Sequence, residues 1–296
     1  MKVEDFSVAD EQDAIHRPLI SVVMPVRNGM PWMEHQLRAL LAQDFLGDWE
    51  LVVADNGSVD GTRRCADEWS ERDARVRVID ASARRGAGAA RNQGVQSALG
   101  LNLAFCDADD VVQPGWLSAM LAALADADLV AGVFDFSSLE GGPKSDPTPA
   151  STQQLGFLPF ALGANLAVRR HAFDEVQGFC ETLPAGEDVD LSWRLQLAGH
   201  SFAISTEALV AKREHVGSKA TFDAAWAYGQ CAAPLYVRYR AEGMRRKLLG
   251  AAKAWIWLVA TSPGLVKPAR RHQWVRTLGI RAGRVAGSVR HCAFFP

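Results

Sequence analysis

The sequence predicts an α/β protein in which a mostly parallel sheet is covered by helices on both faces and is followed by a helical C-terminal region. Apolar runs typical of strands alternate with helical patterns through the first half of the chain. The predicted strands are mostly continuous apolar runs, as expected when both faces of a parallel sheet are buried. At 296 residues and 48% hydrophobic content, the chain is long enough to bury a substantial core.

The predicted elements of the first half follow one another in a regular order. Strands are expected at 19–26, 49–55, 75–80, 101–107 and 127–133. Helices are predicted between them, at 32–43, 62–73, 87–99 and 114–126. The last of these begins with a proline, at a position where the missing N–H costs nothing.

The second half is predicted to be more irregular. The segment 137–154 is rich in Gly, Pro, Ser and Thr, which favours an exposed loop. A strand over 160–170 and a helix over 187–199 follow, and a glycine ends the helix. From about Phe222 onward the pattern is mostly helical, with breaks expected at Pro234, Pro263 and Pro268.

Cysteine usage and charge narrow the class of protein. The five cysteines are scattered without any CxxC, which argues for a reducing compartment and against a zinc or disulfide framework. The polar residues 1–18 lack the apolar segment of a secretory signal and are expected to be a leader.

The net charge is −2, yet residues 236–296 carry 13 Lys or Arg against one acidic residue, so this tail carries +12 and the remainder −14. Two regions that face different partners are therefore expected.

An acidic turn, "CDADD", follows the predicted strand 101–107. Ligands of open parallel sheets bind beyond the carboxyl ends of the strands. Asp107 and Asp109 are two positions apart, so in extended backbone they project to one side. Oxygen ligands at this spacing suit Mg²⁺ or Mn²⁺. The alternative is an acidic turn that caps the following helix.

The other polar motifs are ambiguous one by one. "DNGSVDGT" is a common type of turn, and the glycine-rich "RRGAGAARN" either holds a phosphate at a helix start or packs closely on the sheet. Glu187 and Asp188 begin a predicted helix, where the macrodipole stabilises negative charge without any catalytic role. His215 stands alone, as most surface or packing histidines do.

Taken in order, these motifs resemble an inverting glycosyltransferase of family two, which has the Rossmann-like GT-A fold. The resemblance covers about two thirds of the chain, from Ile20 to His215. The motifs that carry it are "SVVMPVRN", "DNGSVDGT", "RGAGAARNQG", "FCDADD", "GANLAVRRHAFDEVQGF", "GEDVDLSWRLQLAG" and "REH". It implies a catalytic domain (19–220) with a nucleotide-sugar half (19–135) and an acceptor half (155–220). The leader (1–18) and a basic, mainly helical region (221–296) are expected on either side of it.

The resemblance implies a divalent cofactor, Mn²⁺ or Mg²⁺, that grips the diphosphate of a nucleotide-sugar. Asp107 and Asp109 match the DxD motif, with Asp109 as the more direct ligand, and His215 matches a third metal or diphosphate contact. The metal would stabilise the leaving diphosphate. Asp55 matches the residue that pairs with the nucleobase, usually of a uridine or similar nucleotide. Arg91 matches a basic residue near the nucleotide or its phosphates.

The resemblance also assigns the acceptor side. Asp188 matches the base that deprotonates the acceptor hydroxyl, and Glu187 would hold the acceptor or the helix turn.

Pro25 and Arg27 would line the nucleotide pocket, although Arg27 stands where the family often has an aromatic residue. Trp193 either borders the sugar or acceptor pocket or packs in the core.

The basic tail has two interpretations. Residues 254–266 are uncharged for thirteen positions, short of the ~18–20 that a spanning helix needs. With Trp255, Trp257 and flanking basic residues, the segment is typical of a helix lying on anionic lipid. The enzyme would then be cytoplasmic, peripheral at the inner face of the cell membrane, with a glycan or lipid-linked acceptor. The alternative is a helical cap packed on the catalytic domain.

Two other function classes are compatible with an α/β sheet. A sugar nucleotidyltransferase is expected to have a basic glycine-rich loop after its first strand, where "MPVRNGMPW" supplies a single glycine. A nucleic-acid-binding protein with a basic tail would have aromatic residues interleaved among the basic ones. These are scarce here and the remainder is acidic, so a nucleic-acid partner is not expected.

Overall fold

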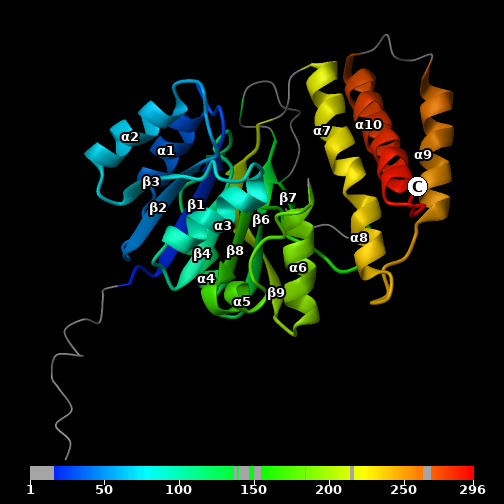
Figure 1. Cartoon of the computed structure of the whole chain (residues 1–296). Coiled ribbons are helices and arrows are strands. Elements are labelled where there is room, and N and C mark those ends of the chain that lie inside the picture. Colours follow the sequence, from blue (N-terminus) through cyan, green and yellow to red (C-terminus); the bar gives the residue numbers. More distant parts are fainter. Residues whose placement is uncertain are drawn as a thin grey trace, which may run out of the picture.

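The structure, a computed structural model, describes residues 17–136, 139, 147–149, 155–183, 185–213, 217–262 and 268–296. Nine strands form one sheet in the order β3-β2-β1-β4-β8-β6-β9-β5, with β7 paired to β6 (Figure 1). The strands are β1 (Ile20–Val26), β2 (Trp49–Asp55), β3 (Val76–Asp80), β4 (Asn102–Cys106), β5 (Val111–Val112), β6 (Leu129–Asp135), β7 (Thr148–Pro149), β8 (Asn165–Arg169) and β9 (Phe202–Ala211). The predicted loop 137–154 lies largely outside the described residues.

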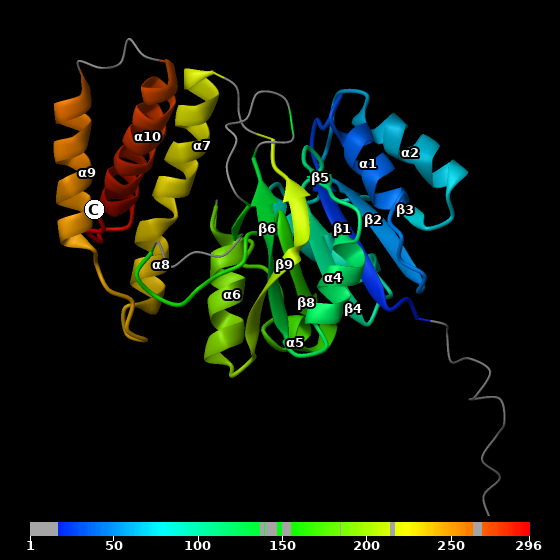
Figure 2. The same cartoon turned by 180° about the vertical axis from the view of Figure 1, so that it is seen from behind.

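Helices cover both faces of the sheet, as predicted (Figure 2). They are α1 (Met33–Leu41), α2 (Thr62–Arg72), α3 (Ala87–Ser97), α4 (Trp116–Ala123), α5 (Arg170–Glu175) and α6 (Glu187–Leu197). Because strand side chains alternate, Met24 packs on one face with Leu37 of α1 and Met120 of α4. Val23 packs on the other face with Val95 of α3 and Leu191 of α6.

The α/β fold class is confirmed, and the sheet is mixed. The pairs β1–β2, β2–β3, β1–β4 and β6–β9 are parallel. β8 runs antiparallel to both of its neighbours, β4 and β6, and β5 and β7 pair antiparallel to β9 and β6. The parallel block β3-β2-β1-β4 corresponds to the strand–helix alternation read from the first half of the sequence.

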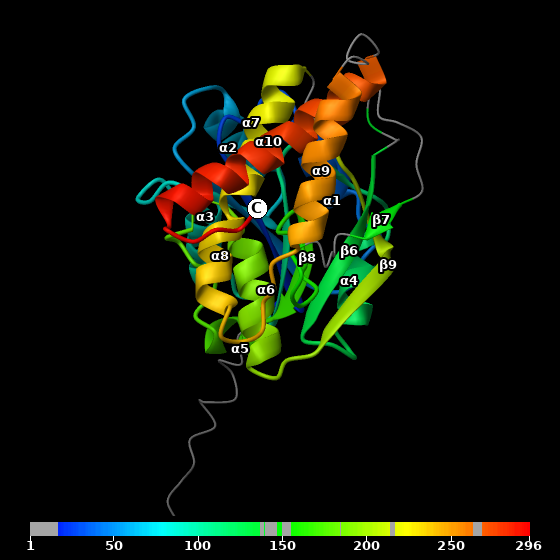
Figure 3. The ribbon, with the colours of Figure 1, turned by 90° about the vertical axis from the view of Figure 1, so that its right-hand side faces the viewer.

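The described C-terminal region, 217–262 and 268–296, which includes the basic tail, is mostly helical. Its helices are α7 (Ser218–Gln230), α8 (Ala232–Tyr239), α9 (Leu248–Thr261) and α10 (Pro268–Arg290). α10 lies between α7 and α9, and α9 is outermost (Figures 1 and 3). A Cβ at Gly283 of α10 would lie 2.3 Å from the carbonyl oxygen of Trp226 in α7, so only glycine allows the two backbones to approach this closely.

α8 attaches the tail to the sheet domain through an apolar cluster. Trp193 of α6 is fully buried there against Leu235 and Tyr239 of α8, and its indole N–H donates to the carbonyl of Leu158 at 2.9 Å. Of the two interpretations of Trp193, the structure therefore supports core packing. Among the helices that the structure describes, none is both long and apolar enough to cross a membrane.

Candidate active site

Two adjoining cavities lie beyond the carboxyl ends of β1 and β4, where ligands of open α/β sheets bind. The larger, of about 610 Å³, reaches the N-terminus of α6. The smaller, of about 380 Å³, lies against the turn between β1 and α1. Both are lined by the same four residues, which we call the shared wall: Arg27, Gly86, Ala87 and Asp107.

Asp107 follows β4 directly, and two cations hold its carboxylate. Oδ1 accepts a hydrogen bond from Arg91 at 3.0 Å, and Oδ2 accepts one from Lys212 at 3.3 Å. Burial alone would raise the pKa of Asp107, but the charges of Lys212 and Arg91 outweigh it and lower the pKa. Lys212 also donates to Asp110 at 2.6 Å. Asp107 is therefore ionised at neutral pH.

Arg91, on α3, connects the acidic turn to α6. It is 4% exposed, and its second terminal nitrogen donates to Glu187 Oε1 at 2.7 Å. Two glycines make room for this link. A Cβ at Gly163 would lie 2.8 Å from the Arg91 Cζ, and a Cβ at Gly88 would lie 3.1 Å from the Glu187 Cγ. The helix that carries the predicted base is thereby tied to the predicted metal ligand.

Asp188 lies at the start of α6 and lines the larger cavity. Its two carboxylate oxygens accept hydrogen bonds from the backbone N–H groups of Gly163, at 2.9 Å, and Val189, at 2.8 Å. Burial, reinforced by the nearby charge of Glu187, raises the pKa of Asp188 to about 6. A carboxylate with this pKa is suited to accept a proton near neutral pH.

The smaller cavity is lined by the two nucleotide-pocket residues predicted at the end of β1 and by the predicted metal ligand Asp109. Pro25, Arg27 and Asp109 line it, together with Trp32. The guanidinium of Arg213 lies 3.8 Å above the Trp32 ring, and its Nε donates to the Asp109 carbonyl at 3.0 Å. Among the described residues, no hydrogen bond or ion pair occupies the Asp109 carboxylate, so this carboxylate remains available to a ligand.

Asp55 and Asn56 order the turn that follows β2. Asp55 is buried, and its Oδ1 accepts a hydrogen bond from the Ser58 N–H at 3.1 Å. Asn56 lines the smaller cavity and accepts a hydrogen bond from the Gly86 N–H at 3.0 Å, while its own Nδ2 donates to the Arg84 carbonyl at 2.8 Å. Asn56 therefore fixes the glycine-rich loop that forms part of the shared wall.

Most of the predicted site residues converge on these two cavities. His215 lies outside the described residues. Sequence reasoning missed three residues of the site: Trp32, Asn56 and Lys212. Lys212 directly follows β9, which ends at this edge of the sheet. A cation in that position could have been recognised from the sequence, but β9 itself was not predicted.

Comparison with known proteins identifies the family. The sequence model described as "Glycosyl transferase family 2" matches residues 21–179. The chain belongs to glycosyl transferase family 2. The chain is 28% identical over 200 residues to glycosyltransferase AglE of Haloferax volcanii, covering 65% of this chain and 66% of that protein. It is 29% identical over 299 residues to the pre-mycofactocin glycosyltransferase of Mycobacterium tuberculosis, covering 93% of this chain and 58% of that protein.

This family 2 chain spans about two thirds or less of the length of these two relatives. Its structure is similar to that of the mannosyltransferase PcManGT from Pyrobaculum calidifontis, solved in complex with GDP-Man and Mn²⁺, with a TM-score of 0.69 and 18% identity, covering 94% of this chain and 88% of that one. It is also similar to S. aureus TarS in complex with UDP-GlcNAc, with a TM-score of 0.53 and 17% identity, covering 94% and 93%. At these identities the likeness establishes the GT-A fold alone.

Proposed function

We propose that this protein is a metal-dependent, inverting glycosyltransferase that moves a sugar from a nucleotide-sugar to an acceptor hydroxyl. The observation that carries the proposal is the shared wall between the two cavities. On one side lies the smaller cavity with Asp109 and the glycine-rich loop, which suits the donor. On the other side lies the larger cavity with Asp188, which suits the acceptor.

The acidic turn has the donor set of a hard divalent cation. One oxygen from each of Asp107, Asp109 and Asp110 lies within 4.8 Å of the others, and no nitrogen or sulfur ligand is among them. Asp109 offers an unengaged carboxylate, and Asp107 is ionised. Mn²⁺ or Mg²⁺ held by these two residues would supply positive charge to the departing diphosphate. Lys212 adds a fixed positive charge beside them.

Asp188 is the proposed general base. Its hydrogen bonds to two backbone N–H groups fix the carboxylate at the cavity wall. It takes the proton of the acceptor hydroxyl, whose oxygen then attacks the anomeric carbon as the bond to the diphosphate breaks. A single displacement inverts the configuration and needs one base. Glu187 is engaged by Arg91, so its proposed role is to hold the start of α6 in place.

The donor class is a nucleoside diphosphate sugar. The complexes of similar structures with GDP-Man and UDP-GlcNAc support this class, although they differ in both nucleotide and sugar. In this chain Asp55, Pro25, Arg27 and Arg91 are proposed to support nucleotide binding. Arg91 would act indirectly, by holding Asp107 in position, because both of its terminal nitrogens already donate to carboxylates.

The metal proposal is tested with Asp109→Ala. Loss of this carboxylate should abolish Mn²⁺-dependent binding of a nucleoside diphosphate, measured by calorimetry, while thermal unfolding is unchanged because the side chain is partly exposed. Asp126→Ala, which removes an exposed carboxylate after α4, is the matched control and should bind normally. Equal binding by wild type in EDTA and in Mn²⁺ would overturn the metal dependence.

We also propose that α9 rests on an anionic membrane surface, which would bring a lipid-linked acceptor to the site from the cytoplasmic side. Its outward apolar side chains include Leu249, Ile256 and Val259, which are 81%, 67% and 73% exposed, and Lys253 is exposed among them. Residues at this helical spacing share one face. This face adds to the basic charge of the tail.

The membrane proposal is tested by flotation with anionic vesicles. Full-length protein should float, and float less in high salt because the electrostatic attraction is screened. Ile256→Ser should reduce flotation without changing stability, since the side chain is exposed. Val237→Ser, which changes an exposed apolar residue of α8, is the control. Wild-type protein that stays unbound would leave α9 as a structural helix only.

A further inference from the structure

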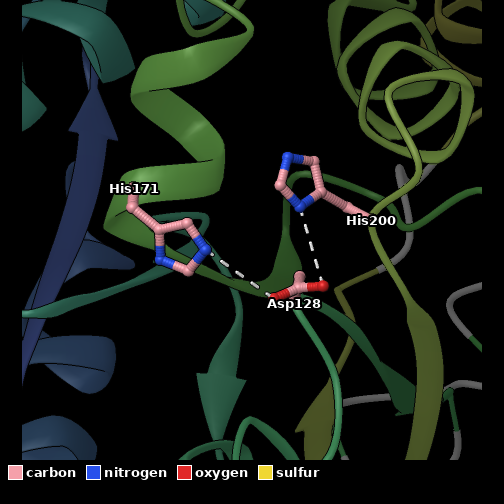
Figure 4. Close-up of side chains that lie close together, drawn as sticks. All are labelled: Asp128, His171 and His200. Atoms are coloured by element: carbon pink, nitrogen blue, oxygen red, sulfur yellow. Dashed lines mark ion pairs between the residues drawn. The ribbon is translucent and has the colours of Figure 1, made fainter.

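A second polar cluster lies at the opposite end of the sheet from the two cavities. Asp128 precedes β6, His171 belongs to α5, and His200 lies in the turn between α6 and β9. Both imidazole rings point toward the Asp128 carboxylate (Figure 4). One nitrogen or oxygen atom from each of the three residues lies within 4.8 Å of the others. Three separate segments of the chain thus present metal-ligating atoms to one point.

The spacing of these atoms is close to that of a transition-metal site. His171 Nε2 lies 3.9 Å from Asp128 Oδ1, and His200 Nδ1 lies 3.6 Å from Asp128 Oδ2. Zinc binds imidazole nitrogen and carboxylate oxygen at about 2.0–2.2 Å, so tetrahedral neighbours lie about 3.4 Å apart. The two nitrogen–oxygen distances therefore exceed the tetrahedral value by about 0.5 Å or less, and His171, the most exposed of the three ligands, has room to rotate toward the ion.

The surroundings orient the three ligands as outer groups do in metal sites. His200 Nε2 lies 3.1 Å from Glu175 Oε2, so one ring nitrogen has a carboxylate partner and the other faces Asp128. The N–H and Oγ of Ser201 donate to Asp128 Oδ2 at 3.0 and 2.8 Å. These bonds leave Oδ1 as the more open oxygen of Asp128.

One neighbouring cation, Arg169, lies 3.7 Å from Asp128 Oδ1. Its guanidinium is bonded elsewhere, because Nε donates to the Leu124 carbonyl at 3.0 Å and the terminal nitrogen donates to Leu124 and Ala125 at 2.7 and 2.8 Å. Arg169 therefore caps α4, and with Oδ1 it forms a long ion pair in place of a hydrogen bond. Burial would raise the pKa of Asp128, but the Ser201 hydrogen bonds, with His200 and Arg169, lower it, so the carboxylate is ionised.

We propose that Asp128, His171 and His200 form a binding site for a zinc-type divalent transition ion. Two imidazoles and one carboxylate match the ligand preference of zinc, and differ from the oxygen-only set of the active site. The side chain of His171 is 65% exposed, which gives the ion an entry path and leaves room for a water as fourth ligand. The site is independent of the glycosyltransferase proposal.

The bound ion would join α5 to the turn that follows α6. α6 carries Asp188 at its other end, so the ion would brace the helix on which the proposed base lies. Without a metal, the same contacts describe a His200 ring that lies between the carboxylates of Asp128 and Glu175. The two explanations differ in one measurable property, the binding of a metal that depends on His171.

The test uses full-length protein stripped with a chelator and then titrated with Co²⁺ or Zn²⁺. Wild type should bind Co²⁺ with the visible absorption typical of imidazole ligands in tetrahedral geometry, and Zn²⁺ should displace it and raise the melting temperature. His171→Ala should lose the absorption, one equivalent of metal and the thermal shift. Because His171 is largely exposed, this variant is expected to fold normally. His272→Ala, which removes an exposed histidine of α10, is the matched control and should behave as wild type.

A second variant tests the role of the outer carboxylate. Glu175→Gln should keep the site but weaken its affinity by about 10–100-fold, the usual effect of removing such a partner. Asp109→Ala should leave the cobalt absorption unchanged, because it alters only the active-site acidic turn. Wild type without the absorption, or His171→Ala with the same absorption and stoichiometry as wild type, would overturn the proposal.

Discussion

The turn after β4 and the N-terminus of α6 both place a carboxylate in the wall of the larger cavity, yet they treat it in opposite ways. Asp107 lies between two cations, and its pKa is lowered. Asp188 has backbone N–H groups as its hydrogen-bond donors and a neighbouring Glu187, and its pKa is raised to about 6. Such divergent environments separate a permanently charged group from one that exchanges protons.

The difference lies in the partners more than in the depth of burial. Arg91 contributes to both sides, since it binds Asp107 directly and reaches the α6 terminus through Glu187. Its charge lowers the pKa of Asp107 and opposes the rise at Asp188. The difference between the two carboxylates can therefore be tested by substitutions at Asp188 or at Arg91.

The largest effect is expected from Asp188→Asn. The amide keeps the shape but cannot accept the acceptor's proton, so transfer should fall by about 10²–10⁴-fold with little change in donor affinity. Steady-state kinetics and donor calorimetry measure the two quantities. Glu187→Gln, which keeps an acceptor for Arg91, is the comparison variant and should lose less activity. The opposite order of losses would assign the base to Glu187.

Removing the link between the regions should mainly cost stability. Arg91→Met removes the buried cation shared by Glu187 and Asp107 and leaves Asp107 with Lys212 alone, which should lower the free energy of unfolding by about 3–5 kcal/mol. Urea unfolding followed by circular dichroism measures this loss. Arg63→Met breaks the exposed pair with Asp67 and should cost about 0–1 kcal/mol. Equal losses in the two variants would mean that the buried link has no special weight.

The smallest effect is a pH dependence from Asp188. Since the base must be ionised, the transfer rate should fall about tenfold per pH unit below a midpoint near pH 6. Stability depends on the same group. The folded state binds the proton of Asp188 more tightly than the unfolded state, in which the pKa of this carboxyl has its ordinary value of 3.8. The protonated Asp188 therefore makes its full contribution to the free energy of unfolding below about pH 4, and this contribution is lost as pH rises through about 6.

Asp188→Asn serves as the control for both readouts. The stability of the variant relative to wild type should improve as pH rises from about 4 to about 7, because the variant has no proton to lose there. Its residual activity should lack the midpoint near pH 6. A wild-type midpoint near pH 4 would contradict the raised pKa.

The sequence predicts the first half of the fold well because mostly apolar strands alternate there with helical patterns. The observed bounds of β1 to β4 lie within about two residues of the predicted ones. β9, with the sequence "FAISTEALVA", was not predicted, because the first half of this strand is partly polar. That half is also only half-buried in the structure. The antiparallel direction of β8 depends on pairing with β4 and β6, which local sequence does not encode.

The predicted site residues that line the two cavities lie in local sequence motifs. Asp107, Asp109, Glu187 and Asp188 lie in short acidic motifs at a strand end or a helix start. Lys212 has no such motif, and it reaches Asp107 only because β9 and β4 end at the same edge of the sheet. Likewise the cluster of Asp128, His171 and His200 comes from three distant segments, so no spacing in the sequence indicates it.

The shared wall also has a thermodynamic consequence. Asp107 and Arg27 face both cavities, so a ligand that changes the charge at this wall from one side changes the binding free energy on the other. Linkage makes this coupling reciprocal: the factor by which a donor alters acceptor affinity equals the factor by which the acceptor alters donor affinity. Because the two cavities share these residues, a ligand in one cavity is an effector of a ligand in the other.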